Sequence, residues 1–279
     1  MEISDNIESP VVSIIMNCYN CSTYLKEAID SVYTQTYGDW EIIFWDNVST
    51  DNSAEIAKNY DSKLRYFCGD KNVPLGNARN LAIEKAQGQY IAFLDCDDIW
   101  LPSKLEKQIS LFEANSNIKL VFSDCNVINS QHEILYRLFS VQKPSRGFAF
   151  NELLLSNNFI SLVTVVIERS VFYDIGTFND EFKIAEEYDL FLRIAHKHPL
   201  DYVDEALAEY RIHENNWSHR QDIGIKEQLK IIEFWLNKDI LIKNKLRTKK
   251  IKRKIALCLY YIVKYMKFPK KWSAFYKTQ

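Results

Sequence analysis

Glycine is scarce in this 279-residue chain, which contains only 7. So low a content argues against disorder and against a fold built on glycine-rich phosphate loops. The dinucleotide-binding pattern Gly-x-Gly-x-x-Gly is absent, which argues against a dinucleotide-dependent oxidoreductase. Long apolar runs are missing too: the longest, residues 255–263, is far shorter than the roughly 18 residues of a membrane-spanning helix. With 47% hydrophobic and 26% charged residues, the composition is that of an ordinary globular protein.

Features that direct export are also missing. The first ten residues are polar and acidic, without the basic start and apolar run of a secretory signal. Cys18 and Cys21 form a lone Cys-x-x-Cys pair, with no second pair at zinc-site spacing. We interpret them as ordinary reduced thiols, with a redox or metal role as the alternative. The sequence therefore predicts a cytoplasmic protein.

Short apolar runs alternate with amphipathic stretches along the chain. In the first half, this pattern predicts strands at residues 11–16, 41–45, 64–68 and 90–94, and helices at 22–35, 52–60 and 76–86, the first capped by Ser22 or Thr23. In the second half, it predicts helices at 103–115, 148–156, 185–195 and from 223 onward, strands at 120–124, 163–168 and 206–213, and a less regular region at 126–147.

Strand–helix–strand repeats imply a mostly parallel sheet with right-handed crossovers. Ligands of such sheets bind outside the carboxyl ends of the strands. Asn17, Asp46 and Asp95 all fall at predicted carboxyl ends. Topology alone therefore predicts that these three polar residues share one rim.

The strongest chemical signal is the run DCDD at positions 95–98, directly after an apolar strand. Carboxylates two residues apart in a turn can face the same way and offer the hard oxygen ligands that Mg²⁺ or Mn²⁺ prefers. Such an ion would bridge a diphosphate and neutralise charge on a departing nucleotide. Helix capping by Asp98 is the alternative, and the position at a strand end disfavours it.

Further motifs follow in a recognisable order: VSII then NCYN at 12–20, a Ser-x₃-Gln-Thr-x₄-Glu-Ile-Ile stretch at 31–43, DNVSTD at 46–51, GNARN at 76–80, LDCDD at 94–98, EEYDL at 186–190 and YRIH at 210–213. This set resembles family 2 of the inverting glycosyltransferases over about residues 11–217. The resemblance implies an α/β, GT-A-like mixed sheet of mostly parallel strands flanked by helices. Residues 1–100 would bind the nucleotide-sugar, 101–220 would bind the acceptor and catalyse transfer, and 221–279 would form a helical, basic extension.

The resemblance also implies roles for single residues. Tyr19 would stack on the nucleotide base, Asp46 would accept a ring N–H, and Arg79 would reach the base or the phosphates. Asp95 would hold the ribose, and Asp97 would hold Mn²⁺ or Mg²⁺ on the diphosphate. Each has a structural alternative: a core aromatic for Tyr19, a turn former for Asp46 and a solvated helix residue for Arg79. A uracil base is favoured, with dTDP and GDP sugars left open.

Inversion at the anomeric carbon requires a general base that deprotonates the acceptor hydroxyl. The family usually places an Asp second in a Glu-Asp pair at a helix start. Here the pair is Glu186-Glu187, so Glu187 takes the position of the base with one methylene more. Glu186 and Asp189 are the alternatives, and acidic residues at a helix start also complement the helix dipole.

Two residues near the end of the resemblance fit the diphosphate. Arg211 is predicted to clamp a phosphate, and His213 to add an imidazole ligand to the metal ion. A lone His at a strand end is also commonly a polar residue with an ordinary partner.

Acidic residues are absent from Lys243 to Gln279, which contains 13 Lys and Arg residues. Basic residues beside an apolar, aromatic-rich segment favour a helix lying on an anionic membrane surface. Packing on the catalytic domain is the alternative, and nucleic acid is not an expected partner.

We therefore predict a metal-dependent inverting hexosyl- or N-acetylhexosaminyl-transferase that moves a sugar from a nucleotide-sugar donor to a saccharide or lipid-linked glycan acceptor. Surface polysaccharide synthesis in bacteria is the expected setting, in the cytoplasm or at the inner face of the membrane. A non-catalytic sugar-nucleotide-binding or membrane adaptor is the alternative, disfavoured because Asp97 and Glu187 are both present. A nucleotidyltransferase is disfavoured because residues 17–23 have no glycine-rich basic loop.

Overall fold

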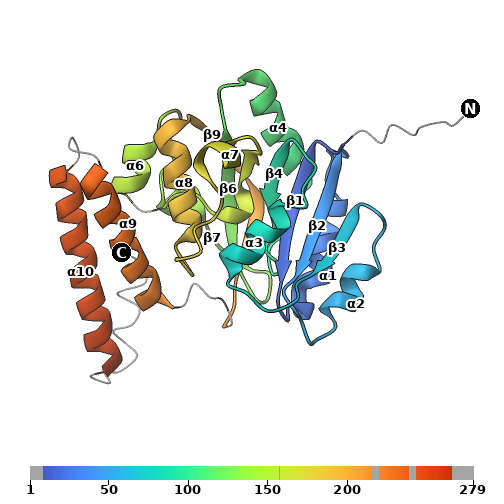
Figure 1. Ribbon diagram of the computed structural model, residues 1–279, viewed down its shortest axis with the longest axis horizontal. Coiled ribbons are helices and arrows are strands. Elements are labelled where there is room, and N and C mark those ends of the chain that lie inside the picture. Colours follow the sequence, from blue (N-terminus) through green and yellow to red (C-terminus); the bar gives the residue numbers. More distant parts are fainter. Residues whose placement is uncertain (1–8, 157, 215, 217–219, 239–242, 266–279) are drawn as a thin grey trace, which may run out of the picture. The chain divides into compact units, whose positions relative to one another are not determined.

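The computed structural model describes residues 9–156, 158–214, 216, 220–238 and 243–265 (Figure 1). The chain forms two compact units. The first comprises Met1–Glu181 and Glu186–Glu214, and the second comprises Phe182–Ala185 and Asn215–Gln279.

The first unit is built on one mixed sheet with the strand order β3-β2-β1-β4-β8-β6-β9-β5, and β7 pairs with β6. Strands β3, β2, β1 and β4 are parallel, whereas β8 runs antiparallel to both β4 and β6. The strand bounds are β1 Val12–Cys18, β2 Trp40–Asp46, β3 Leu64–Cys68, β4 Tyr90–Phe93, β5 Ile99–Trp100, β6 Leu120–Asn129, β7 Ile134–Arg137, β8 Val166–Glu168 and β9 Leu200–Ile212.

Helices cover both faces of the parallel half of the sheet. In Figure 1, α3 lies in front of β1 and β2, and α1 and α2 lie behind them. The helices of this unit are α1 Ser22–Tyr33, α2 Ser53–Lys58, α3 Leu75–Ile83, α4 Lys104–Ala114, α5 Leu138–Val141, α6 Phe150–Leu155, the 3₁₀ helix η1 Leu162–Thr164, α7 Val171–Ile175 and α8 Glu186–Lys197.

The core follows from the side-chain alternation of the strands. Val12, Ile14 and Met16 of β1 belong to one buried apolar cluster with residues of α1 and α4. Burying one such side chain contributes about 1.5–3 kcal/mol, so this cluster fixes the register of β1. On the other face, the backbone of Gly88 approaches so closely that an added Cβ would lie 2.5 Å from the Ser13 nitrogen. A side chain at this position would push β1 out of place.

The expected elements are present, with differences at the least regular places. β9 begins at Leu200, before the predicted residue 206, and the region predicted as irregular contains the end of β6, all of β7 and α5. All four residues of β7 are exposed, so the strand has no buried face that would produce an alternating pattern. The predicted cap of α1 is also different. Neither Ser22 nor Thr23 caps the helix; instead, Asp51 accepts the Ser22 N–H at 3.0 Å.

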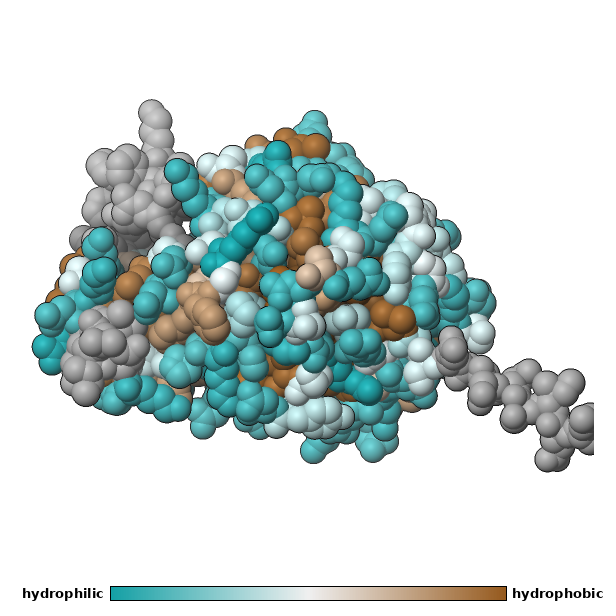
Figure 2. All heavy atoms as spheres, turned by 90° about the horizontal axis from the view of Figure 1, so that it is seen from above, coloured by the Kyte–Doolittle hydropathy of each residue, from teal (hydrophilic) through white to brown (hydrophobic). Residues whose placement is uncertain are grey.

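The second unit contains α9 (Gln221–Lys238) and α10 (Lys243–Tyr265), which pack against each other. In this unit, the buried carboxylate of Glu227 accepts hydrogen bonds from the backbone N–H groups of Lys183, Ile184 and Ala185. Among the described helices, none has a long enough apolar stretch to span a membrane. The face seen in Figure 2 is mostly hydrophilic, with separate hydrophobic patches.

Candidate active site

The polar ends of β1, β2 and β4 define the candidate site. The register pairs Asn17 and Cys18 of β1 with Trp45 and Asp46 of β2, so these ends lie side by side. The DCDD run follows β4 directly, and the Cys96 thiol donates to the Asn17 carbonyl at 3.3 Å. The common rim predicted from the sequence is therefore present.

The acidic run makes contact with the far end of β9. The Asp97 carboxylate lies 2.8 Å from the Nε2 atom of His213, and the buried Asp98 accepts the Arg211 N–H at 2.8 Å. Burial raises the pKa of Asp97, as does the charge of Asp95, and contact with His213 opposes the rise. Burial also raises the pKa of Asp98. Ionising this carboxylate cluster is costly, so the site favours the approach of positive charge.

Arg211 is buried and its guanidinium is held inside this network. Its Nε donates to the Asp97 carbonyl at 2.9 Å, and its Nη2 donates to Glu27 of α1 at 2.6 Å. The guanidinium carbon lies 4.5 Å from the centre of the Tyr24 ring. Arg211 therefore ties α1 and the DCDD run to β9, and this is not the free phosphate clamp that the sequence predicts.

Arg79 of α3 is likewise enclosed, with 3% of its surface exposed. Its Nη2 donates to Asp95 at 3.0 Å, and its Nη1 donates to Glu186 at 2.9 Å. The guanidinium faces two carboxylates, so direct contact with a nucleotide is not supported by this geometry. Arg79 instead joins the end of β4 to the first residue of α8.

Glu187 follows in the first turn of α8 and is partly buried. Burial raises the pKa of its carboxyl group to about 8, and the negative charges of Glu186 and Asp95 act in the same direction against Arg79. A carboxylate with such a pKa is a stronger base than an ordinary surface glutamate. The alternative base Asp189 is paired with Arg193 at 2.8 Å.

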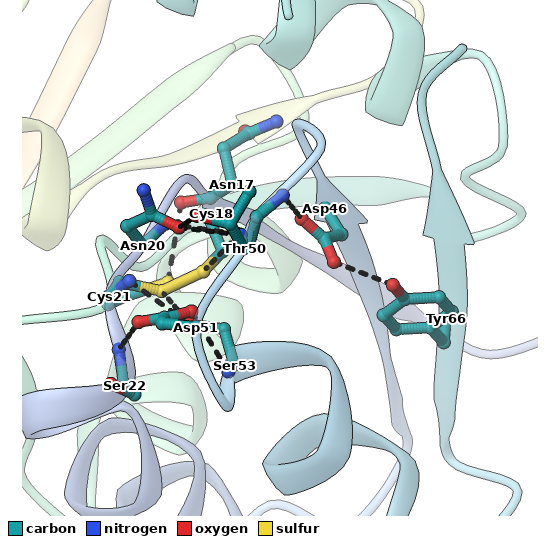
Figure 3. Close-up of a disulfide and its surroundings, with 12 residues drawn as sticks. Asn17, Cys18, Asn20, Cys21, Ser22, Asp46, Thr50, Asp51, Ser53 and Tyr66 are labelled. Atoms are coloured by element: carbon teal, nitrogen blue, oxygen red, sulfur yellow. Dashed lines mark hydrogen bonds between the residues drawn. A yellow bond between two sulfur atoms is a disulfide. The ribbon is translucent and has the colours of Figure 1, made fainter. Parts of the chain in front are cut away.

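The end of β2 carries Asp46, one of the two residues predicted to contact the nucleotide base. Asp46 accepts the Ser49 N–H at 2.7 Å and the Tyr66 hydroxyl at 2.6 Å, which fixes both carboxylate oxygens (Figure 3). Tyr19, in the turn after β1, is 56% exposed. Its ring is therefore a surface aromatic, and the alternative of a core aromatic is wrong.

Cys18 and Cys21, on either side of Tyr19, form a disulfide in the structure (Figure 3). The sequence-based interpretation as reduced thiols is thus corrected. Residues three apart in a tight turn bring their Cα atoms to 5.8 Å, within the range for disulfides.

Several contacts of the site were not predicted from the sequence, although Glu186 was named as an alternative base. Tyr66 fixes Asp46, Glu186 binds Arg79, and Glu27 binds Arg211. Asn47 holds the loop before α3 with two hydrogen bonds: its Nδ2 donates to the Val73 carbonyl, and its Oδ1 accepts the Val73 N–H. Each is a partner reached across the fold, for which the local sequence pattern holds no signal.

The residues around Asp97 fit a divalent ion by their chemistry. A carboxylate and an imidazole converge there, and these ligands suit Mn²⁺. The Nδ2 atom of Asn17, on the same rim, is buried and has no hydrogen-bond partner among the described residues. Buried donors are rarely left unpaired, which indicates a ligand acceptor group on this rim.

Comparisons with known proteins identify the family of this chain. Residues 13–176 match the family model "Glycosyl transferase family 2", which covers more than half of the chain. The chain therefore belongs to glycosyl transferase family 2, as its motifs predicted.

A curated relative is the Escherichia coli protein WfgD, a UDP-Glc:α-D-GlcNAc-diphosphoundecaprenol β-1,3-glucosyltransferase. It is 32% identical over 225 residues, which span 80% of this chain and 85% of WfgD. Uncharacterised glycosyltransferases of several Rickettsia species are longer proteins, and this chain spans 31% to 67% of their length.

Solved structures match at the level of the fold. Residues 1–349 of Staphylococcus aureus TarS, in complex with UDP, superpose with a TM-score of 0.68 over 94% of this chain and 76% of that fragment, at 19% identity. The mannosyltransferase PcManGT of Pyrobaculum calidifontis, in complex with GDP-Man and Mn²⁺, has a TM-score of 0.64 over 88% of this chain and 70% of its own, at 14% identity. These matches establish the predicted GT-A fold.

Proposed function

We propose that this protein is a metal-dependent, inverting glycosyltransferase that uses a UDP-sugar donor and a lipid-linked glycan acceptor. The observation that carries the proposal is the link from the acidic run to the helix of the base. Asp95, Arg79 and Glu186 form a continuous chain of ion pairs, and Asp97 and Glu187 follow at its two ends. Metal ligand and base are thereby fixed relative to each other.

For the donor, we assign Tyr19 to stacking on the base and Asp46 to accepting a ring N–H. The Tyr66 and Ser49 contacts hold Asp46 in place, so its remaining lone pairs have a fixed direction. Asp95 is assigned to the ribose. A UDP-sugar is favoured because WfgD is named for UDP-Glc and TarS binds UDP, whereas PcManGT binds GDP-Man.

Asp97 and His213 would hold Mn²⁺ or Mg²⁺, which supplies positive charge to the leaving diphosphate. Arg79 and Arg211 act as positioning residues: Arg79 holds Asp95, and Arg211 holds the backbone of Asp97. With these residues buried and paired, the carboxylates keep their geometry before the donor binds.

Glu187 is the proposed general base. Its ionised carboxylate accepts the proton of the acceptor hydroxyl, whose oxygen forms the new bond to the anomeric carbon as the bond to the diphosphate breaks. Attack on the face opposite the leaving group inverts the configuration. The alternative, a non-catalytic adaptor, has no use for a carboxyl group with a raised pKa at this position.

For the acceptor, we propose a lipid-linked glycan. WfgD is named for a sugar diphosphate on a polyprenol, which supports a lipid-linked acceptor and a place at the inner face of the membrane. Helix α10 supports membrane contact, because Ile251 and Ile255 are 58% and 53% exposed beside the exposed Lys252 and Lys254. The rest of the basic segment, residues 266–279, lies outside the described residues.

The test is product formation. Purified protein is incubated with Mn²⁺, a synthetic GlcNAc-diphosphate lipid and, in turn, UDP-Glc, UDP-GlcNAc and GDP-Man. We expect transfer from a UDP-sugar, with NMR of the product giving an inverted anomeric configuration and Glu187→Gln giving none. A retained configuration, or transfer undiminished in Glu187→Gln, would contradict the proposal.

A further inference from the structure

Three cysteine sulfur atoms lie close together at the end of β1. Cys18 and Cys21 form the disulfide after β1, and the Sγ of Cys96, inside the DCDD run, lies within 4.8 Å of both. Cys18 and Cys96 are buried, whereas Cys21 is partly exposed. The remaining described cysteines lie apart from this cluster as free thiols, two exposed and one buried: Cys68, Cys258 and Cys125.

The disulfide closes a four-residue ring that holds Tyr19 and Asn20 (Figure 3). Asn20 has the left-handed conformation, with φ of 54°. Its N–H donates to the Ser49 Oγ at 3.0 Å, and its Oδ1 accepts the Thr50 N–H at 2.7 Å. The ring is therefore bonded to the loop after β2.

That same loop fixes the base pocket. The Ser49 N–H bonds the Asp46 carboxylate, and Asp51 accepts the first N–H of α1. The disulfide ring therefore contains the exposed Tyr19 and is joined to Asp46 through Ser49. No other described cysteine pair has such a connection to the site.

We propose that Cys18–Cys21 is a reversible redox modification site that controls the affinity for the nucleotide donor. The proposal rests on the proposed function, because it assigns regulation to the same donor site. The oxidised form holds the Tyr19 ring in place, and the reduced form releases it.

The chemistry is thiol–disulfide exchange with a dithiol reductant. One reductant thiolate attacks the more accessible Cys21 sulfur, and Cys18 leaves as a thiolate that takes up a proton. The second reductant thiol displaces Cys21 and closes the reductant's own disulfide. Two electrons and two protons pass to the protein, which gains two thiols. An oxidised dithiol reverses the reaction.

Reduction lowers affinity because the open loop must be ordered when the nucleotide binds. Tyr19 and Asn20 then lose conformational freedom on binding that the ring had already removed. We expect the dissociation constant for UDP to rise by about three- to tenfold, as is typical when a short binding loop loses its preorganisation.

The experiment compares UDP binding by calorimetry, with Mn²⁺, in oxidised and reduced dithiothreitol. Cys68→Ser/Cys258→Ser serves as the background, which removes the exposed thiols that would form disulfides between molecules. Mass spectrometry after alkylation verifies the redox state of Cys18 and Cys21. The matched control adds Cys18→Ser and Cys21→Ser, and circular dichroism checks its fold.

We expect UDP to bind more weakly after reduction. The control variant with Cys18→Ser and Cys21→Ser should bind UDP as weakly as the reduced protein, with the same affinity in oxidised and reduced dithiothreitol. Equal affinity of the verified oxidised and reduced forms would overturn this proposal alone, as would failure of the disulfide to form. If UDP binds in neither state, the donor site itself is refuted, together with its regulation.

Discussion

Glu187 illustrates how surroundings set the chemistry of a residue. An ordinary glutamate is a weak base at neutral pH, but burial and the charges of Glu186 and Asp95 raise its pKa to about 8. Arg79 opposes the rise and keeps it moderate. The same carboxyl group on an exposed helix would be almost fully ionised at pH 7 and a poorer proton acceptor.

This pKa predicts the pH dependence of turnover. Only the ionised carboxylate accepts a proton, so kcat/KM should rise about tenfold per pH unit below the pKa and level off above about 8. Glu187→Gln should lower kcat by about 10²–10⁴-fold and abolish the rise. Glu187→Asp is the matched control, since it should keep measurable, pH-dependent turnover. A pH-independent wild-type profile would argue against Glu187 as the base.

Val48 is a strained residue of the base-pocket loop. Its φ is 68°, a left-handed conformation that a β-branched side chain rarely adopts. We expect Val48→Gly to raise the free energy of unfolding by about 1 kcal/mol in urea denaturation. Val73→Gly, at a negative φ in a neighbouring loop, should instead lower it by about 0.5–1 kcal/mol. If Val48→Gly and Val73→Gly both lowered the free energy of unfolding, the backbone at Val48 would not be strained.

At the scale of residues, the sequence predicts which side chains reach the rim but not what holds them. Asp46 ends β2 and Asp95 follows two residues after the end of β4, so topology alone brings them to the same rim. The roles of Arg79 and Arg211 depend on partners about a hundred or more positions away in the chain, at separations of 107 for Glu186 and 184 for Glu27. No local pattern encodes such contacts.

Helix α8 carries the proposed general base, Glu187, in its first turn. The three residues before this helix are held by hydrogen bonds. Glu227 of α9 binds three successive N–H groups, those of residues 183–185, which immediately precede Glu186. An ionised carboxylate suits this role because it accepts several hydrogen bonds at once.

Glu227→Gln should therefore lower both stability and turnover. The amide keeps one acceptor oxygen and turns an NH₂ group toward backbone donors, which should cost about 2–3 kcal/mol of unfolding free energy. Glu233→Gln on the same helix is the control, because Glu233 is 62% exposed in its ion pair with Lys250 and should change stability by less than about 1 kcal/mol. Equal effects of the two substitutions would refute the anchoring role.

Elements with at least one buried face could be predicted from the sequence, and elements exposed on both faces could not. The parallel strands are nearly continuous apolar runs, as β1 and β2 show. β7 is exposed along its length, and the first part of β9 contains Asp201, Asp204 and Glu205, so neither matches a strand pattern. The disulfide was missed because spacing alone does not distinguish a bonded Cys-x-x-Cys pair from two thiols.

For the whole molecule, the basic C-terminal segment from Lys243 to Gln279 predicts where the protein works. We expect sedimentation with vesicles that contain anionic lipid, weakening at high salt, and no binding to neutral vesicles. Ile251→Asp/Ile255→Asp keeps the basic residues but removes the exposed apolar ones, and should reduce binding several-fold. Undiminished sedimentation of this variant would show that α10 does not insert its apolar face.

We propose that the acidic run holds a metal ion on the diphosphate of the donor. Calorimetric titration with UDP, with and without Mn²⁺, tests this on the wild type and on Asp97→Ala. We expect Mn²⁺ to tighten UDP binding by about tenfold or more in the wild type and to have no effect in the variant. Binding that ignores Mn²⁺ in the wild type, or a Mn²⁺ effect that survives in Asp97→Ala, would contradict it.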